Sequence, residues 1–229
     1  MSVRLTVLEL AARWNRAGAV LDEVDHLLAE RPSDLVLLPE AALHGYVSPE
    51  GDFDLTRFAE PLDGPVAMRA AALARAHHTH LVAPLVLREA AAVYNAIACF
   101  DPTGTPRFVY RKRHPWFPET WATAGGAPYP LVELAGITLT AAICFDVHFL
   151  ADEAAAQLAA ADLLLFPSAW VEELDSRPQL LGDLARRFDL HVANGNWAAG
   201  EVIVPGQGGS CVVAPDGSIT RGRRIDVEL

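Results

Sequence analysis

Apolar and polar residues recur along the chain in two rhythms, one typical of strands and the other of helices. Residues 3–10 alternate in the manner of a strand, whereas Val20, Val24 and Leu27 recur at helical spacing and predict a helix over residues 16–30. Further helices are predicted at residues 65–78, 151–160 and 179–189. Further strands are predicted at residues 35–38, 81–87, 93–100, 107–110, 131–134, 137–143, 163–166, 192–196, 209–213 and 218–220. Because strands alternate with helices and also meet in hairpins, we expect an α/β fold with mixed sheets and outer helices.

Composition narrows the class of protein. No repeat or linker interrupts the pattern, so we expect one domain over residues 1–229. The 18 basic and 29 acidic side chains give a net charge of −11, which argues against a nucleic-acid partner. The longest uncharged stretch, residues 202–215, is shorter than the roughly 20 apolar residues of a membrane span. Three widely spaced cysteines and no visible signal peptide predict a cytoplasmic protein.

Three chemically useful side chains, Glu40, Lys112 and Cys144, each follow a predicted strand. In open α/β folds, active sites collect at the carboxyl ends of strands, although an antiparallel strand would end at the opposite edge. Lys112 is the one lysine in a chain with 17 arginines, so a compact ammonium is present where a broad guanidinium is the usual choice. Taken singly, each of the three also has a structural interpretation.

The cysteines differ in their surroundings. Cys99 and Cys211 fall inside predicted strands, where a cysteine is usually a small buried hydrophobe. Cys144 lies where a strand stops and polar residues begin, and a thiol becomes a nucleophile when a nearby base or cation favours its thiolate. Glu40 is a candidate base. His114 or His148 would instead make a Cys–His thiol hydrolase, which is a competing interpretation.

Other motifs carry less chemistry. His77, His78 and His80 match no zinc spacing and are expected to be surface residues near the end of a helix, so no metal site is predicted. The glycines at residues 200–209 do not follow a strand and open a helix as a phosphate-binding loop does, so no nucleotide site is predicted either.

Taken in order, these segments resemble the nitrilase superfamily of carbon–nitrogen hydrolases. Residues 35–40 (LVLLPE), 110–114 (YRKRH) and 143–146 (ICFD) are similar to the family's glutamate, lysine and cysteine motifs. Lesser matches between them make the resemblance collinear over nearly the whole chain; they lie at residues 61–65, 94–95, 166–170, 192–194 and 209–210.

The resemblance implies a fold and a set of roles. The fold would be an α-β-β-α sandwich of two mixed β-sheets with outer helices, in a homodimer or larger homo-oligomer. Glu40 would be the base, Cys144 the nucleophile, and Lys112 with the backbone N–H of Phe145 would stabilise the oxyanion, without metal or organic cofactor. Glu119 resembles the family's second glutamate, which helps to position the lysine and the substrate. The residues expected at the substrate site on the same basis are Phe145, His148, Trp170 and Asn194.

Departures from the family pattern guide the functional hypothesis. Cys144 is followed by Phe-Asp where true nitrilases usually have Trp-Glu, so the chain resembles the amidase and carbamoylase branches, and His148 stands where many relatives have arginine. We therefore expect hydrolysis of a small, aliphatic amide to an acid and ammonia. Alternatives on the same residues are an N-carbamoyl amidohydrolase and an N-acyltransferase. Alternatives of other classes are the Cys–His hydrolase and a binding protein with a lapsed site.

Overall fold

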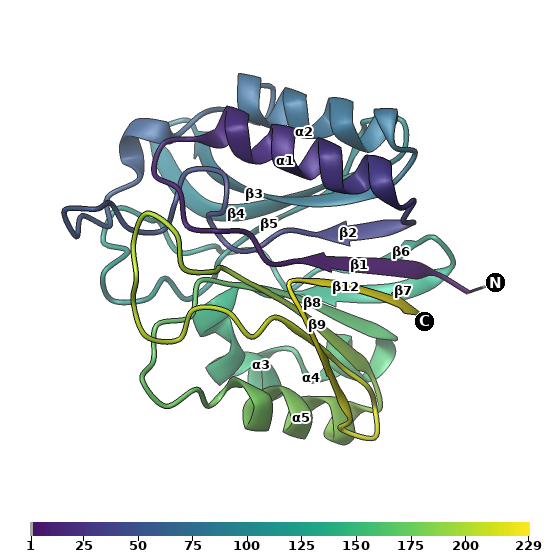
Figure 1. The fold of residues 1–229 in the computed structure, drawn as a ribbon. Helices are drawn as coiled ribbons and strands as arrows, with labels where there is room; N and C mark the ends of the chain where they lie inside the picture. Colours follow the sequence, from purple (N-terminus) through teal and green to yellow (C-terminus); the bar gives the residue numbers. More distant parts are fainter. Residues whose placement is uncertain (1) are drawn as a thin grey trace.

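A computed structural model describes residues 2–229 of the chain as two six-stranded sheets flanked by helices (Figure 1). The first sheet has the order β12 (Arg224–Glu228), β1 (Arg4–Leu8), β2 (Leu35–Leu37), β3 (His80–Glu89), β4 (Ala92–Phe100) and β5 (Pro106–Arg111). The second has the order β11 (Ile219–Arg221), β10 (Cys211–Val213), β9 (His191–Asn196), β8 (Leu163–Ser168), β7 (Ile137–Ala141) and β6 (Leu131–Leu134). The helices are α1 (Ala17–Glu30), α2 (Pro65–Ala76), α3 (Val147–Glu153), α4 (Ala155–Ala160) and α5 (Arg177–Phe188), with 3₁₀ turns η1 (Thr56–Phe58) and η2 (Cys144–Asp146).

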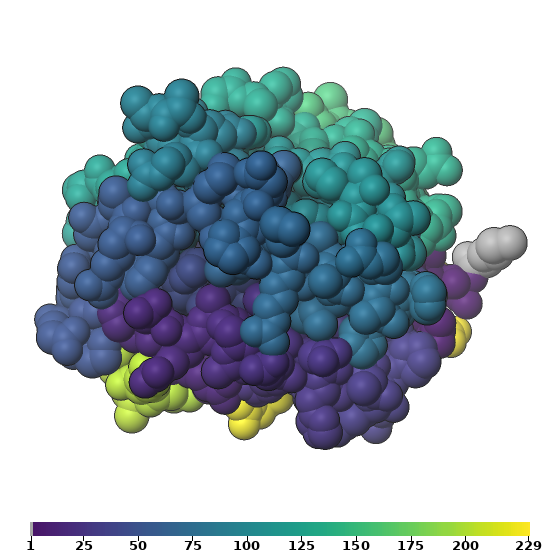
Figure 2. Space-filling view, turned by 90° about the horizontal axis from the view of Figure 1, so that it is seen from above, coloured from purple at the N-terminus to yellow at the C-terminus, as the bar shows by residue number. Residues whose placement is uncertain are grey.

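The layers stack as an α-β-β-α sandwich, which confirms the expected fold class. Helices α1 and α2 cover the outer face of the first sheet, and α3, α4 and α5 cover the second (Figure 1). Seen from above, the purple-to-blue N-terminal segments form most of the surface over the first sheet (Figure 2). One apolar core joins the inner faces of both sheets, with Val7 and Leu37 from the first and Leu139 and Leu165 from the second. Burial of these faces is the main stabilising term.

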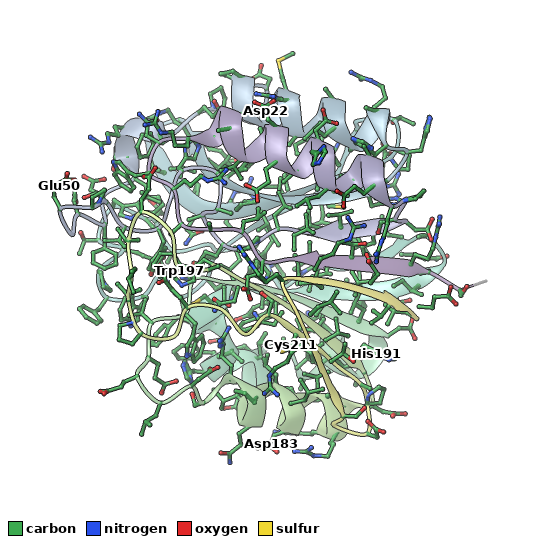
Figure 3. The ribbon with its side chains drawn as sticks, in the orientation of Figure 1. Asp22, Glu50, Asp183, His191, Trp197 and Cys211 are labelled. Atoms are coloured by element: carbon green, nitrogen blue, oxygen red, sulfur yellow. The ribbon has the colours of Figure 1, made fainter. Side chains whose placement is uncertain are left out.

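Strand direction brings the expected residues to one edge. In the first sheet β1, β2 and β3 are parallel, and β5 regains that direction because it is antiparallel to β4, itself antiparallel to β3. Strands β7, β8 and β9 of the second sheet are also mutually parallel. The carboxyl ends of both sets face the same side, on which Trp197 lies after β9, while His191 at the start of β9 lies opposite (Figure 3).

Two predictions of local structure are corrected. The helix expected over residues 151–160 is two short helices, α3 and α4, separated at Ala154, whose φ of −122° and ψ of 17° are not helical. The run of alanines there has no hydrophobic periodicity from which to place a break. The edge strand β12 was not predicted, although its sequence (RIDVE) alternates polar and apolar positions as a half-buried edge strand does. Its residue Ile225 packs into the core, and the strand pairs antiparallel with β1.

Candidate active site

Glu40 follows β2 and is held by three hydrogen bonds in a fully buried position. Its Oε1 accepts Asn95 Nδ2 (2.8 Å) and Lys112 Nζ (2.7 Å), and its Oε2 accepts the backbone N–H of Ala169 (2.7 Å). Asn95 belongs to β4 of the first sheet, whereas Ala169 follows β8 of the second. The carboxylate therefore bridges the two sheets and keeps one lone pair of Oε2 without a partner among residues 2–229.

Lys112 directly follows β5, and the alternation of extended backbone explains its burial. Arg111 and Arg113 turn to the opposite side and pair with Glu89 and Glu153, while the Lys112 side chain points inward and is 0% exposed. Its Nζ donates to Glu40 and to Glu119 Oε1 (2.5 Å). Burial alone would lower the pKa of Lys112, but the charges of the two carboxylates outweigh it and raise that pKa. The ammonium is charged, and its third N–H has no acceptor among residues 2–229.

Glu119 completes the cluster. Besides Lys112, its Oε1 accepts the hydroxyl of Tyr46 (2.7 Å), and its Oε2 accepts Asn95 Nδ2 (3.2 Å), so one amide group bridges both glutamates. Burial raises the pKa of Glu119, the charge of Lys112 opposes that rise, and the charge of Glu40 adds to it. Two carboxylates thus share one ammonium in a place without access to solvent.

Cys144 sits on a sharp turn after β7. It opens η2 with a φ of +47°, a left-handed conformation that is uncommon for a residue with a Cβ and is typical of strained functional positions. The residue is 7% exposed and lines a cavity of about 190 Å³. Burial and the charge of Glu40 raise the pKa of its thiol well above the usual range, while Lys112 and the N–H of Ala169 oppose that shift. The thiol therefore rests protonated beside a buried base.

Asp146 ties this turn to the lysine segment. Its Oδ2 accepts the N–H of Ile143 (2.9 Å) and the hydroxyl of Tyr110 (2.7 Å), and its Oδ1 accepts the N–H of His114 (2.9 Å). The carboxylate links residues on both sides of Cys144 to both sides of Lys112. This role of Asp146 was not predicted from the sequence, although a carboxylate shortly after an apolar strand and a cysteine was a visible signal.

Three of the four residues expected at the substrate site line the cavity with Cys144: Phe145, His148 and Trp170. Asn194 does not. It is fully buried beneath the cavity wall, where its Nδ2 donates to Phe166 O (2.8 Å) and its Oδ1 accepts Arg177 Nη1 (3.2 Å). The expectation that Asn194 contacts substrate does not fit this position, because its polar atoms already have protein partners.

No histidine is hydrogen-bonded to Cys144 within residues 2–229. His114 contacts Glu153 through Nε2 (3.0 Å) and stacks on Phe149, away from the residues that line the cavity. His148 lines the cavity but packs edge-on against Phe145.

Within residues 2–229 no cluster of three or more metal-ligating side chains occurs. Cys99 and Cys211 are buried in β4 and β10, as predicted, and burial raises their pKa values to about 12 and about 11. No helix within residues 2–229 is long and apolar enough to span a membrane.

Comparison of sequences places these residues in a family. A sequence model of the carbon-nitrogen hydrolase family matches residues 3–225. A hydrolase encoded in the pqqF 5′ region of Pseudomonas protegens is 34% identical over 194 residues, covering 81% of this chain and 66% of that protein. Citrullinase from Francisella tularensis is 25% identical over 187 residues, covering 78% and 64%. Nitrilase 1 from Arabidopsis thaliana is 27% identical over 165 residues, covering 63% and 48%. The chain spans about half to two thirds of the length of these relatives.

Solved structures agree in fold. A cysteine-to-alanine mutant of an amidase of the nitrilase superfamily from Nesterenkonia sp. AN1 superposes with a TM-score of 0.86 at 25% identity, covering 99% of this chain and 90% of that one. A CN-hydrolase superfamily protein from Xanthomonas campestris, at 22% identity, gives a TM-score of 0.83 over 100% and 91% of the two chains. The resemblance seen in the three motifs is therefore confirmed, and the chain belongs to the carbon–nitrogen hydrolase family of the nitrilase superfamily.

Proposed function

We propose that the protein hydrolyses a carbon–nitrogen bond of a small, non-peptide amide to an acid and ammonia, with Cys144 as nucleophile. One observation carries the proposal. A buried carboxylate, Glu40, and a buried ammonium, Lys112, are hydrogen-bonded to each other and act electrostatically on a thiol that opens to a cavity. The family and the amidase fold neighbour support the same class of reaction.

Acylation follows from the geometry. The thiol proton passes to the free lone pair of Glu40 as the sulfur attacks the amide carbon, so no free thiolate has to persist against the raised pKa of Cys144. The carbonyl oxygen takes the negative charge, which the third N–H of Lys112 and the backbone N–H of Phe145 stabilise. When the tetrahedral intermediate collapses, the C–N bond breaks and the nitrogen leaves as ammonia with the proton held by Glu40. A thioester remains on Cys144.

Deacylation reverses these proton movements. Glu40, now ionised, removes a proton from a water molecule that attacks the thioester carbon, and the C–S bond breaks with return of that proton to sulfur. The products are the carboxylic acid and the original thiol. Glu119 accepts a hydrogen bond from Lys112, and Asn95 donates one to Glu40. Both act as positioning residues in these steps. These steps use side chains of this chain, the backbone N–H of Phe145 and water.

Acyl transfer to an amine and cleavage of an N-carbamoyl group remain alternatives on the same residues.

We propose that residues 1–229 act as one domain on a small-molecule substrate. A homodimer or larger homo-oligomer stays a prediction, which sedimentation analysis tests.

The test compares Cys144→Ala with Cys99→Ala, a matched variant of a buried cysteine in β4. Ammonia release from a panel of short aliphatic amides should disappear in the first and persist in the second. Mass spectrometry of wild type quenched in acid should find the acyl group on the peptide that contains Cys144. Undiminished ammonia release by Cys144→Ala would refute the proposal. His114→Gln adds a second arm, because a Cys–His enzyme built on that histidine would lose activity whereas the proposed one keeps it.

A further inference from the structure

The cavity that exposes Cys144 also contains a carboxylate with one unused oxygen. Glu172 lines it, and its Oε2 accepts three hydrogen bonds, from Trp170 Nε1 (2.9 Å), Ser176 N (2.9 Å) and Ser176 Oγ (2.8 Å). These bonds give Oε2 of Glu172 a structural role, because they hold Ser176 at the start of α5. They leave Oε1 without a hydrogen-bond donor among residues 2–229. Oε1 is also not one of the polar side-chain atoms that are both enclosed by protein and without a partner. One oxygen is fixed, and the other stays open to a ligand.

His148 is the basic side chain in the cavity that acts electrostatically on Glu172. No salt bridge joins Glu172 within residues 2–229, and no lysine or arginine lines the cavity. The nearest guanidinium in sequence, that of Arg177, is paired with both oxygens of Asp175 (2.8 Å each). Burial raises the pKa of Glu172, but the hydrogen bonds from Ser176 and Trp170, together with the electrostatic effect of His148, outweigh it, so the pKa is lowered and the group is ionised at neutral pH.

Three side-chain donors in the cavity wall are already engaged. The hydroxyl of Tyr46 donates to Glu119, and the Trp170 indole and the Ser176 hydroxyl both donate to Glu172. A substrate carboxylate would meet the negative charge of Glu172, and the side-chain donors left for it in the wall would be Trp116 Nε1 and the ring of His148, which have no hydrogen-bond partner within residues 2–229. A substrate cation would instead be attracted by Glu172. It would contact a carboxylate oxygen and the faces of aromatic residues, among them Trp116 and Phe145, which attract cations.

The position of Glu172 is fixed by the backbone behind it. Gly206 has a φ of +86°, and a Cβ there would lie 2.7 Å from Glu172 N and 2.9 Å from Trp170 O, so the two segments meet at a distance that only glycine allows. Trp197 Nε1 also donates to Trp170 O (3.0 Å). The carboxylate is thus presented by a rigid wall, as a specificity group should be.

We propose that Glu172 selects small amides whose acyl group carries a cationic ammonium. The inference rests on the proposed function, because with ammonia as the leaving group the acyl part is what occupies the cavity. A cavity of about 190 Å³ admits an acyl chain of only a few carbons between Cys144 and Glu172. The ammonium donates to Oε1 of Glu172 while the amide carbonyl lies at the thiol.

The test uses three short amides that differ mainly in terminal charge: β-alaninamide (cationic), butyramide (neutral) and malonamate (anionic). Wild type should show a kcat/KM for β-alaninamide about tenfold or more above that for butyramide, with malonamate lowest, as expected for one charge-assisted hydrogen bond. In Glu172→Gln, which keeps an oxygen to accept the Ser176 and Trp170 donors, the ratio of β-alaninamide to butyramide should fall to within about threefold. Glu173→Gln, an exposed neighbour, is the matched control and should keep the wild-type ratio.

Equal or better use of butyramide by wild type, or an unchanged ratio in Glu172→Gln, would overturn the inference. Calorimetric binding of the three amides to Cys144→Ala separates this failure from failure of the proposed function. If wild type hydrolyses none of them but β-alaninamide binds most tightly, and Glu172→Gln in the same background removes that preference, the pocket assignment stands and the reaction assignment fails. Absence of any preference in binding contradicts the role of Glu172 whatever the turnover.

Discussion

Two ionisable side chains on the same loop, Glu40 and His44, are both buried, and their surroundings could hardly differ more. Glu40 accepts three hydrogen bonds, one of them from an ammonium. His44 is 6% exposed, stacks on Phe58 with ring centroids 5.0 Å apart, and has no hydrogen-bond partner at either ring nitrogen within residues 2–229. Burial lowers the pKa of His44 to about 4, so its ring is neutral.

The comparison of Glu40 with His44 shows how a buried side chain keeps its charge in this protein. Burial penalises the charged form at both places, and only partners of opposite charge offset that penalty. Lys112 keeps its proton because Glu40 and Glu119 face it, whereas the apolar packing of His44 offers its ring nothing comparable. The catalytic groups proposed above therefore depend on one another for their charge, and removing one should disturb the others.

Lys112→Met should have the largest effect, because it leaves two buried carboxylates without a cation. We expect a loss of kcat/KM of at least about 10³-fold from the missing oxyanion donor. We also expect a loss of about 3–5 kcal/mol in the free energy of unfolding at pH 7. The loss should shrink as the pH falls from 7 towards 5, since Glu119, whose pKa is already raised by burial, takes up a proton more readily and one of the two uncompensated charges is removed. Urea denaturation of wild type and Lys112→Met at pH 7 and at pH 5 measures this difference in the free energy of unfolding.

Arg113→Met is the control for this experiment, because it removes a neighbouring cation that is paired with Glu153 near the surface. Its cost should stay below about 1 kcal/mol. If Lys112→Met were as active as wild type, or if its destabilisation did not depend on pH, the charge coupling within the cluster would be disproved.

His44→Phe should have the next largest effect, and only in acid. The pKa of His44 is about 4 when folded and about 6.5 when unfolded, so below pH 6.5 the unfolded chain binds a proton that the folded chain does not. This group alone should therefore cost wild type up to about 3 kcal/mol of stability as the pH falls from 7 towards 4. Phenylalanine keeps the stack on Phe58 and should remove that part of the pH dependence.

The control for His44→Phe is His26→Gln on α1, whose side chain is exposed. Thermal unfolding between pH 4 and pH 7 gives the slopes for all three proteins. Identical acid slopes for wild type and His44→Phe would mean that His44 is not held neutral by its surroundings.

The sequence predicted which ionisable side chains would follow the strands of one edge better than it predicted what surrounds them. The single lysine and the position of Cys144 at the end of an apolar strand were local signals, and strand direction then brought them to one edge. The contacts of Glu40 with Asn95 and Ala169 join three elements that are distant in sequence, so no local pattern could reveal them. Asn194 was expected at the substrate site from the family resemblance, and the sequence alone could not place its side chain, because β9 is buried on both faces and a strand without alternation does not tell which side chains reach the cavity.

Tyr46→Phe should have the smallest effect and tests the partner of Glu119 that the sequence did not identify. The hydroxyl donates to Glu119 Oε1 (2.7 Å), and burial raises the pKa of Tyr46 well above its usual range, so it stays a donor. Loss of this bond removes stabilisation of the ionised carboxylate, which raises the pKa of Glu119 further. We expect about 1–2 kcal/mol lower stability and a shift of the acid limb of kcat/KM towards higher pH, because the ionised cluster then forms at higher pH. Tyr94→Phe, at a half-buried tyrosine that makes no side-chain hydrogen bond within residues 2–229, is the control. Superimposable pH profiles for Tyr46→Phe and wild type would show that Glu119 does not hold its charge through this hydroxyl.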